Sequence, residues 1–153
     1  MIRKLTTDQQ KPLLTTRGKI FLASSLLFNI FVSAVYVYSK LDLTLVRIIG
    51  APILLLIIPF TYTLNEFLKH KEETRIIVSN ALIIIYLLLE LLLDYVLLIP
   101  FRENLAMHIP YILVFYAAEF SIIGVSFRLN RRMGFVILAT FFVLLGCLVF
   151  SYS

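Results

Sequence analysis

The sequence is poor in the residues that cofactor and metal sites commonly use. Its single cysteine, Cys147, excludes an intramolecular disulfide. The two histidines, His70 and His108, are too few to ligate a pair of haems, and no group of cysteines and histidines has the spacing of a metal site. We therefore expect no cofactor and no metal.

Catalytic motifs are missing as well. The sequence contains no GxSxG or HExxH motif and no glycine-rich loop that would hold a phosphate. No internal repeat, low-complexity tract or Gly/Ser linker divides the chain, so we expect a single domain over residues 1–153. These absences argue against an enzyme without excluding one.

Charged residues are scarce and apolar residues are abundant. Only 15% of residues are charged and 61% are hydrophobic, against roughly 25% and 45–50% in soluble domains. Mean hydropathy is +0.97, and a soluble fold of this size could not bury so much apolar surface. We expect an integral membrane protein whose net charge of +5 faces anionic lipid. Nucleic acid is not expected as a partner, because the aromatic residues alternate with apolar ones rather than with basic ones.

Five stretches are long and apolar enough to cross a bilayer, which takes about 20 residues in a helix. The pattern predicts an all-α polytopic transmembrane bundle with five spans, at residues 19–39, 43–65, 76–100, 109–127 and 133–152. Pro52 and Pro59 lie close to one face of the second span, and each removes a backbone hydrogen bond. We therefore expect that helix to be kinked.

The positive residues predict the orientation of the bundle, because short cytoplasmic loops are enriched in lysine and arginine. Eleven of the 14 fall on one side of the predicted spans: Arg3, Lys4, Lys11, Arg17, Lys19, Lys69, Lys71, Arg75, Arg128, Arg131 and Arg132. The other side holds Lys40, Arg47 and Arg102. We expect a multi-pass protein of the cell membrane with a cytoplasmic amino terminus and a carboxy terminus outside.

Three carboxylates, Glu90, Asp94 and Glu119, lie within the predicted spans, where an ionisable group is costly and therefore a candidate functional residue. Glu90 precedes the predicted outer end of its span by ten residues, and Glu119 follows that of the next span by ten. At about 1.5 Å per residue both should lie near the membrane centre and approach each other. Asn29 has a similar depth in the first span, so we expect a polar layer of Asn29, Glu90 and Glu119.

Two polar stripes extend this layer along the helices. Tyr86, Glu90 and Asp94 share a face of the third span, and His108 shares a face with Glu119 on the fourth. Such lines of polar groups are typical of proton or cation pathways, and the aromatic residues around Glu119 also suit an organic cation. A purely structural hydrogen-bonded layer is the alternative.

Two further sets of residues have simpler interpretations. Asp94 would form an ion pair with Arg47, which joins two helices and tunes the carboxylate. Arg128, Arg131 and Arg132 would hold a lipid phosphate at the inner surface, although they also serve simply to orient the chain. Small residues on the fourth span would permit close helix packing and leave a homodimer open.

The preferred hypothesis is a small proton- or cation-coupled transporter or channel that uses these carboxylates. One alternative is a membrane scaffold that regulates a partner without transport. The other is an intramembrane lipid-modifying enzyme, which would need Glu90, Asp94 and Glu119 to converge at one cavity.

Overall fold

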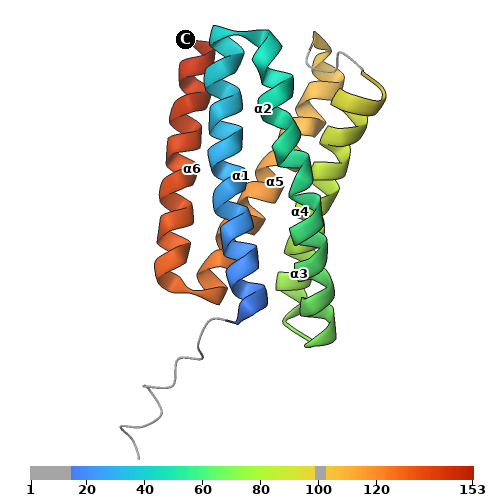
Figure 1. Ribbon diagram of the computed structural model, residues 1–153, viewed down its shortest axis with the longest axis vertical. Coiled ribbons are helices and arrows are strands. Elements are labelled where there is room, and N and C mark those ends of the chain that lie inside the picture. Colours follow the sequence, from blue (N-terminus) through green and yellow to red (C-terminus); the bar gives the residue numbers. More distant parts are fainter. Residues whose placement is uncertain (1–14, 99–102) are drawn as a thin grey trace, which may run out of the picture.

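The computed structural model describes residues 15–98 and 103–153, and within these ranges the chain is helical with no strand (Figure 1). Five helical segments are long and apolar enough to span a membrane: Thr16–Leu41, Thr44–Lys69, Thr74–Val96, Leu105–Leu129 and Arg131–Tyr152. Each of the five overlaps one of the predicted spans. Arg3, Lys4, Lys11 and Arg102 lie outside the described residues, as do positions 99 and 100 of the third predicted span.

The segments form one bundle of helices (Figure 1). The elements are α1 (Thr16–Leu41), α2 (Leu43–Leu55), α3 (Ile57–Lys69), α4 (Thr74–Glu90), the π-helical turn η1 (Leu91–Val96), α5 (Leu105–Leu129) and α6 (Arg131–Tyr152). Helix α1 packs against α2, α3, α6 and α5, whereas α4 packs against α3 and α5. Helix α5 packs against α6 as well as α4, so it connects the helices around α1 with those around α4.

The second span is broken, as its prolines predict. Helix α2 ends at Leu55 and α3 begins at Ile57, with Leu56 between them. Pro59 has no N–H to donate to the carbonyl of Leu55, four residues earlier, so the regular hydrogen-bond ladder is interrupted there. The Leu56 N–H instead donates to the Ile53 carbonyl at 3.1 Å, which tightens the last turn of α2.

Two of the turns consist of a single residue. Asp42 ends α1 through its N–H, which donates to the Tyr38 carbonyl at 2.7 Å, and starts α2 through its side chain, which accepts from Thr44 N at 2.9 Å. Asn130 likewise ends α5, and its side-chain oxygen accepts from Arg132 N and Met133 N, the second and third N–H groups of α6. Both residue types are favoured at such positions because their short side chains accept backbone hydrogen bonds.

Helices α5 and α6 approach each other closely beside the Asn130 turn. A Cβ atom built on Gly134 would lie 2.5 Å from Phe127 Cδ1 and 2.8 Å from Phe127 Cα. Only glycine fits at this crossing, because the missing side chain lets the two backbones come together.

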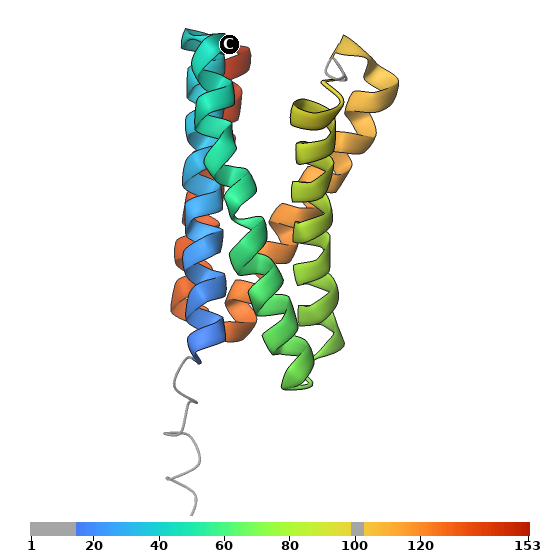
Figure 2. The same ribbon diagram turned by 45° about the vertical axis from the view of Figure 1, so that its right-hand side comes forward.

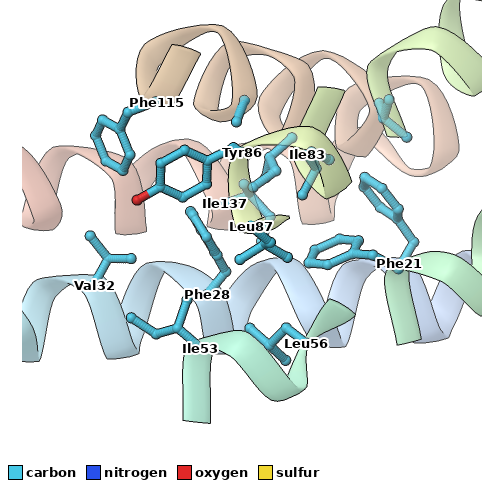
Figure 3. Close-up of a cluster of buried hydrophobic side chains, with 14 of the residues drawn as sticks. Phe21, Phe28, Val32, Ile53, Leu56, Ile83, Tyr86, Leu87, Phe115 and Ile137 are labelled. Carbon is cyan, nitrogen blue, oxygen red and sulfur yellow. The ribbon is translucent and has the colours of Figure 1, made fainter. Parts of the chain in front are cut away.

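The buried core runs through the middle of the bundle and is built from all the long helices (Figure 3). Phe28 of α1, Leu87 of α4 and Ile137 of α6 belong to this core, and each is 0% exposed. Towards the end that carries the carboxy terminus, α1, α2 and α6 diverge from α4, η1 and α5 (Figure 2). The polar residues of the candidate site lie between these two groups of helices.

Candidate functional site

A cavity of about 610 Å³ lies between the two diverging groups of helices, lined by residues of α1, α2, α4, η1, α5 and α6. Five of its lining residues also belong to the buried core: Val32, Ile53, Tyr86, Tyr111 and Phe115. Figure 3 labels all of these except Tyr111. The core therefore forms the inner end of the cavity. Its volume falls in the range of about 300–1,000 Å³ that is usual for small-molecule sites.

Glu90 lies on the cavity wall where two tyrosines hold its carboxylate. The Tyr86 hydroxyl donates to Glu90 Oε2 at 3.4 Å, and the Tyr111 hydroxyl from α5 donates to the same oxygen. The two hydroxyls lie 3.1 Å apart, and their rings pack with centroids 5.8 Å apart. This arrangement fixes the direction of the carboxylate, because both tyrosines are themselves packed in the core.

Asp94 and Arg47 both line the cavity, but the ion pair predicted between them is not present. Among the residues that the structure describes, no ion pair joins the two side chains. Instead, Tyr95 of η1 donates from its hydroxyl to the backbone carbonyl of Arg47 at 2.9 Å. The π-helical turn changes the direction of the residues after Glu90, and Tyr95 is the side chain that reaches α2.

His108 of α5 also lines the cavity. Its ring stacks on Tyr111 with centroids 6.3 Å apart and an interplanar angle of 16°. The cavity thus brings together Glu90, Asp94, Tyr86, His108 and Arg47, all of which the sequence singled out.

Glu119 does not lie in this cavity, and the predicted approach of Glu90 to Glu119 is wrong. Glu119 is 0% exposed and lies in the packed interface of α1, α5 and α6. The reason is the position of the helix ends: α5 starts at Leu105 rather than Ile109, and η1 ends at Val96. Glu119 is therefore about 21 Å from the start of α5, whereas Glu90 is about 9 Å from the end of its segment.

Asn29 is the partner of Glu119, as the predicted depth of the two residues implies. With its amide nitrogen turned towards the carboxyl, Asn29 donates to both Glu119 oxygens at 3.2 Å. The other end of the amide lies 2.8 Å from Thr140 Oγ1 of α6. The predicted layer of three residues is therefore divided into two sites, Glu90 with its tyrosines and Glu119 with Asn29.

Tyr111 and Thr140 are the residues that sequence reasoning missed. The depth of Tyr111 is set by the start of α5 at Leu105, four residues before the predicted start at residue 109. Its real depth follows from Asn104, which caps α5 by accepting from Ala106 N at 3.0 Å. An asparagine just before an apolar run is a recognised helix start, so this signal was available in the sequence.

The three predicted lipid-phosphate residues, Arg128, Arg131 and Arg132, have different contacts in the structure. Arg128 forms an ion pair with Glu73 and lines a hollow of about 450 Å³ that also contains Arg75. Arg131 lies over the Phe135 ring at 6.0 Å, and Arg132 contacts Asn130 only through its backbone N–H. A lipid phosphate held by the three arginines stays a prediction.

No group of three or more metal-ligating side chains occurs in the part of the chain that the structure describes. The chemistry available at the cavity is therefore that of carboxylates, phenols, an imidazole and a guanidinium. In comparisons with known proteins, no protein-family model, no curated protein and no solved structure matches this chain.

Proposed function

We propose that this chain is a multi-pass membrane protein that binds a small organic cation in the cavity and moves it across the bilayer. The observation that carries the proposal is the cavity itself, which contains two carboxylates, Glu90 and Asp94, among aromatic side chains. Carboxylates attract a cation by charge, and aromatic faces attract it by cation–π interaction. Arg47 and His108 are the basic residues among those that line the cavity.

The residues that line the cavity favour an organic cation over a bare metal ion. Six of its twenty lining residues are tyrosines, among them Tyr36, Tyr86, Tyr111 and Tyr116. A hard metal ion takes six or more oxygen ligands at close range, whereas a large organic cation is satisfied by ring faces and one or two carboxylates. Glu90 is already oriented by two phenols, so it is prepared to receive such a ligand.

The positive residues give the proposal its direction. If the cytoplasmic side is the side with most lysines and arginines, the end of the cavity that Ser39, Ser151 and Tyr152 line, beside the carboxy terminus, faces the outside. We test this topology in a Cys147→Ser background with two single cysteines. A membrane-impermeant maleimide added to intact cells should label Ser39→Cys in the cavity and not Lys69→Cys at the opposite end. The reverse labelling pattern contradicts the proposed orientation.

Binding and transport are tested with tetraphenylphosphonium, a permanently charged aromatic cation. The purified protein in detergent should bind it, and Glu90→Gln and Asp94→Asn should each weaken binding about tenfold or more, because a unit charge is lost from the site. Glu66→Gln is the matched control, since Glu66 pairs with Lys69 on α3, away from the cavity. Equal affinity in the wild type and both cavity variants would refute the site.

Transport is measured separately in vesicles that contain the protein. We expect accumulation of the probe driven by a pH gradient, and loss of accumulation in Glu90→Gln. Binding without any flux would contradict transport and favour the alternative of a regulatory or scaffold protein that senses a cation.

A further inference from the structure

Glu119 is buried apart from the cavity but close to its inner end. It lies eight residues after Tyr111 on α5, about 12 Å along the helix. Phe115, which lines the cavity, lies one turn before Glu119 on the same face. Glu119 and Asn29 are each 0% exposed, so the carboxyl group is sealed from the cavity in this conformation.

The hydrogen bonds around Glu119 have two complete arrangements. If Glu119 is charged, it only accepts, so the Asn29 amide nitrogen must face it at 3.2 Å and the amide oxygen must accept from Thr140 Oγ1. If Glu119 carries a proton, it donates to the amide oxygen, and the amide nitrogen donates to Thr140 Oγ1 at 2.8 Å. In that second arrangement the Thr140 hydroxyl donates to the Ile137 carbonyl at 2.7 Å.

The orientation of the Asn29 amide is thus tied to the proton on Glu119. If the amide oxygen faces a charged Glu119, two acceptors meet. If the amide nitrogen faces the O–H of a protonated Glu119, two donors meet. Either mismatch in a buried site costs about 1–3 kcal/mol. Asn29, Glu119 and Thr140 come from three different helices, α1, α5 and α6. A change at one carboxyl therefore changes the bonding between all three.

A proton is the ligand that this site fits. The packed residues leave no room for a larger ion, since Glu119 and Asn29 are both 0% exposed. In residues 15–98 and 103–153 no basic side chain forms an ion pair with Glu119. Helix α1 presents the neutral Asn29 and α6 the neutral Thr140. The nearest titratable groups on α4 are Tyr86 and Glu90, which lie at the level of Tyr111.

We propose that Glu119 is a proton-binding site that controls the affinity of the cavity for its cation, with the Asn29 amide turning over as the proton leaves. This inference rests on the proposed cation-binding function. The carboxylic acid gives up its proton to water that enters from the cavity past Phe115, and no other bond is formed or broken. The negative charge that remains then lies about 12 Å from the level of Glu90, within the same low-dielectric bundle.

The size of the coupling follows from this distance. One unit charge at about 12 Å, at an effective dielectric constant of about 20, changes the affinity for a monovalent cation about tenfold. Deprotonation of Glu119 therefore strengthens cation binding about tenfold, and by reciprocity the bound cation favours loss of the proton. Exchange of a proton for a cation results.

The first experiment compares tetraphenylphosphonium binding to the wild type and to Glu119→Gln, which keeps the shape of the neutral acid. At acidic pH both proteins should bind equally, because Glu119 is neutral in both. At alkaline pH the wild type should bind about tenfold more tightly. Because other titrating groups are the same in both proteins, the ratio isolates Glu119. A ratio that does not change with pH, or that changes with sodium instead, overturns the proposal.

The second experiment does not depend on cation binding. Infrared difference spectra of wild-type protein with ¹³C-labelled glutamate should show loss of a protonated carboxyl band as the pH rises. Spectra with labelled asparagine should show a side-chain amide band that shifts over the same pH interval and is missing in Asn29→Leu. A carboxyl band that never changes, or that changes without the amide, refutes the inference. If these bands change but no variant or wild type binds the probe, only the proposed function fails.

Discussion

Replacing Gly134 by alanine should loosen the contact between α5 and α6, although alanine is the better helix former. Inside a helix, Gly→Ala normally stabilises by roughly 0.5–1 kcal/mol. At Gly134 the new Cβ would lie 2.8 Å from Phe127 Cα and 2.5 Å from its ring, where ordinary contacts are 3.4–4 Å. A backbone atom cannot turn aside as a flexible side chain can, so the two helices must separate. Such overpacking costs about 1–3 kcal/mol.

Gly146 provides the matched control, because it lies on the same helix and a Cβ there meets nothing within 4 Å. Both substitutions carry the same gain in helix propensity, so the difference between them equals the packing cost alone. With about 2–4 °C per kcal/mol for a chain of this size, Gly134→Ala should melt about 2–12 °C below Gly146→Ala. Thermal unfolding of the two proteins in one detergent, followed by circular dichroism, measures this difference.

Equal melting temperatures for the two alanine variants would refute the reasoning, because they would show that α5 and α6 are not in backbone contact at Phe127. The contact also matters for the proton site. Thr140 lies six residues after Gly134 on α6, so a displaced α6 would move its hydroxyl away from Asn29. Gly134→Ala should therefore also weaken the amide response described for Asn29.

Thr63→Val should destabilise the protein by about 1–3 kcal/mol, because it leaves the buried Asn80 amide, now 2.9 Å from Thr63 Oγ1, without its acceptor. Thr63→Ser should restore most of the melting temperature, and a valine variant as stable as the serine variant would contradict this role. Arg17 and Glu72, joined at 2.7 Å and partly buried, should show a coupling of about 1 kcal/mol in a double-mutant cycle of Arg17→Gln and Glu72→Gln. The coupling should fall with added salt, and a cycle that closes at zero would show that the pair contributes nothing.

The spans and the broken second helix could be predicted from the sequence, because each depends on local properties. A run of about 20 apolar residues must satisfy its backbone hydrogen bonds within itself, so helices are the expected solution. The effect of Pro59 is equally local, since it removes a defined hydrogen bond. The depth of Asn29 relative to Glu119 was also predictable, because both lie near the centres of long helices, where an error of a few residues at the ends matters least.

The relation between Glu90 and Glu119 could not be predicted in the same way. It depended on where α5 begins and on where the helix after Glu90 ends, and the expected boundaries were each displaced by four residues. Errors of this size are ordinary for helix ends, but on two antiparallel helices they add to about 12 Å. Asp94 and Tyr95 lie in the π-helical turn, which no local residue pattern predicts. The ion pair expected between Arg47 and Asp94 failed because it rested on regular helical geometry there.

The single-residue turns at Asp42 and Asn130 have a mechanical consequence. A turn of one residue, with hydrogen bonds to both flanking helices, leaves almost no free dihedral angles between them. A tilt of α5 must therefore move α6 with it as one rigid body, and the same holds for α1 and α2. The break at Leu56 is the compliant joint in the described helices. Any motion that widens or narrows the space around Glu90 should therefore use Leu56 as its hinge, with α1–α2 and α5–α6 each moving as a rigid body.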